Sequence, residues 1–167
     1  MSSSEQASGK RADALANRLI QGARSLAEFA SGLSEAAWNT PVTGDGRPVG
    51  VVVHHVASVY PVEVELAQVL ASGSPITGVT MEVINTMNAE HARNNAAISK
   101  EETLELLEKN SKAAAEAIRR FSDEALENAA TVSLYGDAPL TAQFFIEDHA
   151  LRHSFHHLSR IRKTLDK

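Results

Sequence analysis

Residues 49–70 read VGVVVHHVASVYPVEVELAQVL, and this stretch decides between a helical and a mixed fold. The run from Val51 to Val53 has the β-branched character of a strand. However, strict alternation of apolar and polar residues fails at once within it. Projected at about 100° per residue, the apolar side chains fall within an arc of about 100°, which favours a helix over about residues 48–72. The arc contains Val51, Val52, Val59, Val62, Leu66, Val69 and Leu70.

This predicted helix also carries two histidines and a proline. His55 lies near the middle of the apolar arc, so we expect its imidazole to face the interior, whereas His54 lies about 100° away. Pro61 removes the backbone hydrogen bond to the carbonyl of Ala57, so we expect a kink one turn after the histidines.

Three further helices follow from apolar residues that alternate spacings of three and four. They cover about residues 6–34, 79–121 with a break near residue 98, and 139–165. Their apolar stripes are Leu15, Leu19, Gly22, Leu26, Phe29 and Leu33; Leu104, Leu107, Ser111, Ala114, Ile118 and Phe121; and Phe144, Leu151, Phe155, Leu158, Ile161 and Leu165. Turn formers separate the helices, and no strand is predicted. The sequence therefore predicts an all-α four-helix bundle in which residues 1–167 form one domain, with a flexible N-terminus of about residues 1–6.

Composition argues against several classes of function. The chain has 167 residues, of which 43% are hydrophobic, enough for one substantial core. Its longest apolar run, residues 49–53, is too short to span a bilayer, and the N-terminus lacks the order of a signal peptide, so we expect a cytoplasmic protein without a membrane partner. A net charge of −5 with scattered basic residues argues against nucleic acid. Because cysteine is absent, a metal must be held by His, Asp or Glu, and any thiol must come from outside.

Histidines in the last predicted helix offer metal ligands. His153 and His157 lie one helical turn apart on the same side, so both imidazoles can reach a single ion. His149, one turn earlier, forms an alternative pair with His153. If one of these pairs meets His55, three neutral imidazoles with an open fourth position form a catalytic type of site for zinc or a similar divalent ion. Otherwise the histidines form a solvated polar face.

Two more histidines and two carboxylates lie in or near these segments. His156 points away from the pair, and His91 has no partner at ligand spacing, so His91 is expected to be ordinary surface. Glu147 and Asp148 are expected to be solvated helix surface, because carboxylates are seldom buried, and a role in orienting an imidazole or relaying a proton is the alternative.

Four stretches occur in a characteristic order. They are Trp38 ahead of the second helix, Val53-His-His-Val-Ala57, Asn88-Ala-Glu-His-Ala-Arg93, and His153-Ser-Phe-His-His-Leu-Ser-Arg-Ile161. In this order, over nearly the whole chain, they resemble the DinB-like, YfiT-like family of metal-dependent enzymes. The resemblance implies a DinB/YfiT-like bundle whose connection between helices two and three departs from simple up-down-up-down order. It maps the metal ligands onto His55, His153 and His157, and it also allows a homodimer.

The same resemblance implies a chemistry. The expected enzyme acts on a small-molecule substrate and uses a divalent metal, zinc or nickel, to lower the pKa of an external low-molecular-weight thiol, as a thiol S-transferase does. Activation of water by the metal would give a hydrolase. The catalytic residues remain open. The alternative is a non-catalytic, stress-related interaction protein in which a fourth protein ligand closes the metal site.

Overall fold

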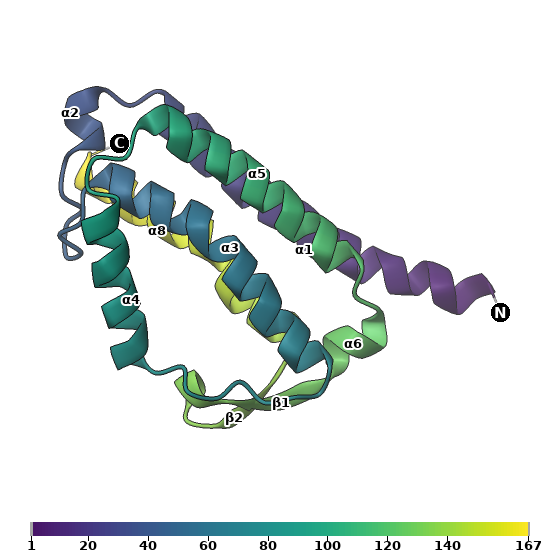
Figure 1. Ribbon diagram of the computed structural model, residues 1–167. Coiled ribbons are helices and arrows are strands. Elements are labelled where there is room, and N and C mark those ends of the chain that lie inside the picture. Colours follow the sequence, from purple (N-terminus) through teal and green to yellow (C-terminus); the bar gives the residue numbers. More distant parts are fainter. Residues whose placement is uncertain (1, 167) are drawn as a thin grey trace.

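Four long helical elements build the molecule. The computed structural model describes residues 2–166, and the side chains of residues 9–166. The bundle consists of α1 (Ser2–Ser31), α3 (Val49–Ala71), α5 (Lys100–Arg119) and a C-terminal run made of α7 (Ala142–Phe145), η2 (Ile146–Leu151) and α8 (Arg152–Thr164) (Figure 1). The predicted all-α four-helix bundle is confirmed. The flexible N-terminus predicted for about residues 1–6 lies outside the residues whose side chains are described.

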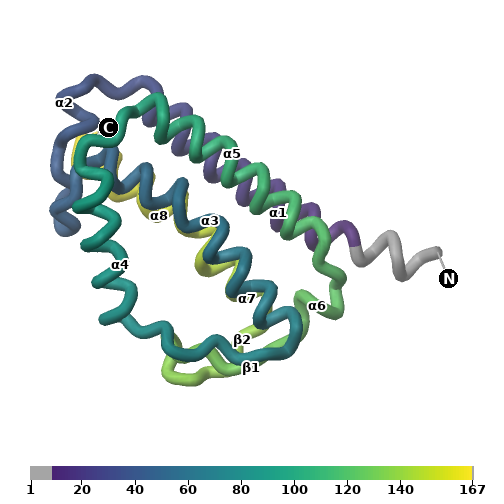
Figure 2. The backbone as a smooth tube through the Cα atoms, in the orientation of Figure 1, coloured from purple at the N-terminus to yellow at the C-terminus, as the bar shows by residue number. Residues whose placement is uncertain are grey.

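The directions of the helices depart from up-down-up-down order, as the resemblance implies. Helices α3 and α5 run in the same direction, opposite to α1 and α8 (Figure 1). Helix α1 packs against α5 and α8, and α3 packs against α5 and the C-terminal run. Helices α3 and α5 follow one another among the four bundle helices and run parallel. The chain between them must therefore return along the length of the bundle. Helix α4 (Met81–Asn94) provides this return (Figure 2).

The predicted third helix, residues 79–121, is two separate helices. The expected break is confirmed: Ser99 caps α5, since its Oγ accepts a hydrogen bond from the backbone N–H of Glu102 at 3.1 Å. The placement of the first half in the bundle is wrong. Residues of α4 contribute nothing to the buried core, and Met81 and Met87 are 58% and 53% exposed. The large apolar side chains of α4 stay largely exposed, Val83 at 42% among them, so this helix lies outside the core.

Helix α3 forms one wall of the core, but not with the predicted face. Val62 is 43% exposed, whereas Val56, Tyr60 and Ala67 are fully buried. The buried face is displaced by about 110° from the predicted arc. The reason is that α3 is apolar almost all round, so its own pattern does not fix which side the neighbouring helices cover.

The same apolar character bears on the membrane. By length and composition alone α3 is long and apolar enough to cross a bilayer, a test that the core helix of a globular protein also passes. In the structure, 67% of its most apolar window is buried inside the bundle, as in the core helix of a globular protein.

Pro61 leaves one backbone acceptor of α3 without its usual partner. The carbonyl of Ala57 instead accepts a hydrogen bond from Nδ2 of Asn110 on α5, at 2.8 Å. Helix α3 continues through the proline and changes direction near its middle (Figure 1), which agrees with the predicted kink. Asn110 thus ties the bend of α3 to α5.

The segment before the last helix contains structure that the sequence did not predict. It forms α6 (Asp123–Glu127) and a hairpin of β1 (Ala129–Val132) and β2 (Ala138–Thr141), joined through the 3₁₀ turn η1 (Ser133–Tyr135). The expectation of no strand is therefore wrong. The strands are short, and Gly136, at a φ of 63°, provides the left-handed turn between them. The hairpin crosses the end of the bundle where α3 finishes (Figure 1).

Close helix contacts hold the ends of α3 and α8. Trp38 of α2 (Glu35–Trp38) lies against the first turn of α3, where a Cβ at Gly50 would come within 2.2 Å of the indole ring. A Cβ at Gly22 of α1 would lie 2.3 Å from Oγ of Ser154 on α8. Glycine at these positions lets the backbones approach.

Candidate metal centre

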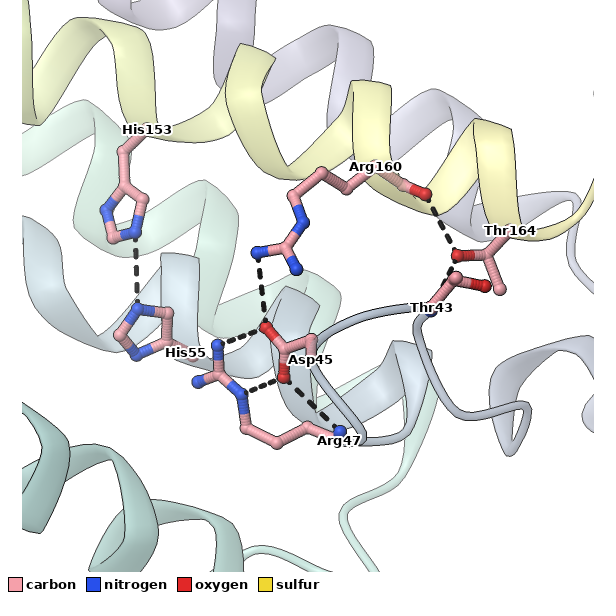
Figure 3. Close-up of polar contacts among 7 residues, drawn as sticks. All are labelled: Thr43, Asp45, Arg47, His55, His153, Arg160 and Thr164. Carbon is pink, nitrogen blue, oxygen red and sulfur yellow. Dashed lines mark hydrogen bonds and ion pairs between the residues drawn. The ribbon is translucent and has the colours of Figure 1, made fainter.

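Helices α3 and α8 bring together three predicted histidines. His55, His153 and His157 each offer one nitrogen, and these three atoms lie within 4.8 Å of one another. Nε2 of His55 lies 3.2 Å from Nε2 of His153 (Figure 3). Zinc bonds of about 2.0–2.1 Å at a tetrahedral angle would hold two ligand nitrogens about 3.3 Å apart. The donor set and its spacing therefore fit a divalent ion.

Burial sets the protonation of two members of this group. His55 and His157 are 7% and 6% exposed. Burial, reinforced by the neighbouring His153, lowers the pKa of His55 to about 3 and that of His157 to about 2. Both imidazoles are therefore neutral at physiological pH, which is the form that binds a metal.

The π-helical turn η2 decides which pair of histidines is used. A π turn contains more residues than an α turn, so it changes the phase of the residues before α8. The ring of His149 stacks on Phe145 with centroids 4.4 Å apart, and its Nε2 lies 2.8 Å from the hydroxyl of Tyr135. The alternative pair of His149 with His153 is therefore not the pair that meets His55.

A buried carboxylate lies beside one imidazole. Oε1 of Glu63, on α3, lies 2.9 Å from Nδ1 of His153, and Glu63 is 8% exposed. Nδ1 makes no hydrogen bond among the described residues, so Glu63 acts on this ring through its charge and its proximity, while Nε2 lies near His55. Glu63 was not predicted as a site residue, although an acidic residue within the apolar α3, two turns after His55, was the available signal.

The carboxylates that the sequence offered for this role lie elsewhere. Glu147 pairs with Arg18 at 2.7 Å. Asp148 accepts a hydrogen bond from the hydroxyl of Tyr135 and pairs with Arg152 at 3.5 Å. Neither candidate meets the three-histidine group, and Glu63 lies beside it instead.

Two further histidines border the group without joining it. Nδ1 of His54 lies 2.8 Å from Nε2 of His91, and their rings stack. His91 is half-buried, and its ring also meets that of His55 edge to face, with centroids 5.7 Å apart. The expectation that His91 is ordinary surface is therefore wrong: it docks α4 onto α3. His156 is exposed, and all three lie outside the group, as predicted.

The loop before α3 places charges near the histidines. Oδ1 of Asp45 accepts a hydrogen bond from Nε of Arg47 at 2.6 Å, and Oδ2 accepts one from Nη2 at 2.8 Å. Nη1 of Arg160, on α8, lies 3.5 Å from Oδ2 (Figure 3). The hydrogen bonds from Arg47 lower the pKa of Asp45 to about 2. These charged residues were not predicted from the sequence, where the turn formers of this loop indicate only a change of direction.

A small cavity adjoins His153. Its volume is about 140 Å³, and it lies between the end of the hairpin and the start of α8. It is lined by Glu63, Tyr135, Asp148, His149, Arg152, His153 and His156.

Comparisons with known proteins agree with this arrangement. A sequence model of the DinB superfamily matches residues 18–161. The structure of YfiT from Bacillus subtilis, described as "a probable metal-dependent hydrolase with an unusual four-helix bundle topology", matches with a TM-score of 0.74 and 16% identity, over 93% of this chain and 86% of YfiT. A mycothiol-dependent maleylpyruvate isomerase matches with a TM-score of 0.68 and 12% identity, over 90% of this chain but only 60% of the isomerase. No functionally curated protein matches the sequence. Likeness to solved structures at these identities shows the fold alone.

Proposed function

The chain belongs to the DinB superfamily, and on that premise we propose that it is a metal-dependent enzyme whose ligands are His55, His153 and His157. The observation that carries the proposal is the convergence of these three side chains from α3 and α8. The metal we propose is zinc or nickel, because imidazole suits both.

Residues in and beside the three-histidine group would have different roles in binding the metal. Burial of His55 and His157 keeps their lone pairs available, so ligand binding needs no proton release at neutral pH. Glu63 lies beside the ring of His153, and its negative charge partly balances an added cation. When bound, a divalent ion stabilises the anionic form of a thiol or water beside it, and so supplies a nucleophile at neutral pH.

We propose two alternatives for the group that the metal activates, an external thiol or a water molecule. The chain has no cysteine, so a thiol must be an external cofactor, and the isomerase that shares the fold is mycothiol-dependent. YfiT, which also shares the fold, is described as a hydrolase, which would use water. The reaction proposed is attack of the thiol or water on an electrophilic small molecule, as in a thiol S-transferase or a hydrolase.

A non-catalytic metal clamp is the competing function. A structural site is normally closed by four protein ligands, whereas a catalytic site uses three. The potential ligand group found among the described residues consists of three histidines, which favours catalysis.

The test begins with metal binding to protein purified without a histidine tag. Metal analysis and titration with zinc or nickel should give one ion per chain, and His157→Ala should cost most of the affinity. His156→Ala is the matched control, because it removes the neighbouring, exposed imidazole and should leave the affinity unchanged.

Activity is measured next, in metal-loaded and chelated protein. A panel of low-molecular-weight thiols and electrophiles, together with hydrolase substrates, should reveal turnover that needs the metal. The enzymatic proposal fails if no substrate shows metal-dependent turnover and His157→Ala behaves as the wild type does. The homodimer and the absence of membrane and nucleic-acid partners stay predictions, and sedimentation at micromolar concentration tests the first.

A further inference from the structure

Two arginines share one carboxylate beside the three-histidine group. Arg47 is held by Asp45 through two hydrogen bonds of 2.6 and 2.8 Å, and Arg160 lies 3.5 Å from the same carboxylate. Two positive charges thus face one negative charge, which leaves one positive charge in excess. The side chain of Asp45 is only 7% exposed, so this pairing is shielded from water.

Arg47 has donor capacity that the protein does not use. Its Nη1 is buried and has no hydrogen-bond partner among the described residues, although Nε and Nη2 are both bonded. A buried donor without a partner, above all on a charged group, is costly to the folded protein. An anionic oxygen beside Nη1 would remove that cost.

The position of Arg47 ties it to the histidines. Figure 3 shows the guanidinium ends of Arg47 and Arg160 on the side of Asp45 that faces His55 and His153. The carboxylate of Asp45 therefore holds both guanidinium groups near the region beside His55 and His153.

We propose that Arg47 and Arg160 form a subsite for a carboxylate carried by the small molecule on which the three-histidine group acts. A guanidinium fork matches the planar geometry of a carboxylate. The excess positive charge favours an anion over a neutral group. This inference rests on the proposed function and narrows its ligand to an acid.

The experiment compares succinate with its uncharged diamide, succinamide, by calorimetric titration of zinc-loaded and metal-free protein. Succinate should bind the wild type, and succinamide at least about tenfold more weakly, because a charge-assisted hydrogen bond contributes about that much or more to affinity. Arg47→Met should weaken succinate binding by at least about tenfold while the zinc stoichiometry is unchanged. Arg120→Met, which removes an exposed arginine at the end of α5, is the matched control.

Arg160→Met is a second variant that keeps the test decisive if Arg47→Met does not fold. It leaves the bonds between Asp45 and Arg47 in place, and it should weaken succinate binding as well. The subsite is refuted if succinate and succinamide bind alike, if succinate does not bind, or if folded Arg47→Met and Arg160→Met both bind it as the wild type does. If zinc does not bind but succinate binding depends on Arg47, the subsite stands and the proposed metal function fails.

Discussion

Replacement of Asn110 tests how the bundle tolerates a proline inside α3. In the wild type, the side chain of Asn110 donates to the carbonyl of Ala57, which Pro61 leaves without a backbone donor. Asn110→Ala removes that donor. A buried acceptor left without a partner costs about 1–3 kcal/mol of the free energy of unfolding. For a chain of this size each kcal/mol lowers Tm by about 2–4 °C, so a loss of about 2 kcal/mol lowers Tm by about 6 °C.

A double-mutant cycle isolates this contact. Pro61→Ala restores a backbone N–H at position 61, which can donate to the carbonyl of Ala57 as in an ordinary helix. In that background Asn110→Ala should cost less than about 0.5 kcal/mol, giving a coupling energy above about 0.5 kcal/mol. The assay is urea unfolding followed by far-UV circular dichroism.

A second asparagine supplies the control for the cycle. Nδ2 of Asn128 donates to the carbonyl of Ala71 at 2.6 Å, at the end of α3 and away from the proline. Asn128→Ala should therefore cost the same in both backgrounds. The reasoning is refuted if Asn110→Ala also costs the same with and without Pro61.

Three further predictions concern packing, pH and the site. Gly22→Ala places a Cβ 2.3 Å from Oγ of Ser154, so α8 must move. We expect the free energy of unfolding in urea to fall by about 1–3 kcal/mol and zinc binding to weaken. Gly9→Ala, where a Cβ meets open space, should show neither effect. The pKa of Asp45 falls from 3.8 to about 2 on folding, so the ionised carboxylate stabilises the fold by about 2 kcal/mol. This stabilisation is complete above about pH 5 and is lost as the pH falls through 2, so unfolding measured across this range should show a loss that Asp45→Asn lacks. Glu63→Gln removes the carboxylate beside Nδ1 of His153 and should lower zinc affinity about 10–100-fold in a competition titration, and unchanged affinity would rule out a role for its charge.

The sequence predicted best those helices that have one clear apolar stripe. The stripes of α1 and α5 are buried or half-buried, as at Leu19 and Ile118, because polar residues fill the rest of each helix. The stripe predicted for the last helix is correct in part. Leu158 and Ile161 are buried, and Leu151 and Leu165 are half-buried against the core, whereas Phe144 and Phe155 are 44% and 37% exposed. Phe144 lies before the π turn η2, which shifts the register that one continuous α-helix would have.

The candidate site was predicted in part, and partly for the wrong reason. His55 is buried as expected, but it lies about 120° from the centre of the buried face of α3, on its rim. It is covered because α8 and the loop before α3 approach that rim. The roles of Glu63 and Arg47 depend on which side chains of distant segments they meet, and helical periodicity along one segment carries no such information.

The separation of the histidines along the chain also orders events during synthesis. His55 precedes His153 by 98 residues, and α5 lies between them. A growing chain thus presents α3 to the cell for the whole time that α4, α5 and the hairpin are being made. The three-histidine group is completed only when α8 has left the ribosome and docked onto α3. A metal ion that meets the nascent chain earlier therefore finds only one of the three imidazoles, that of His55.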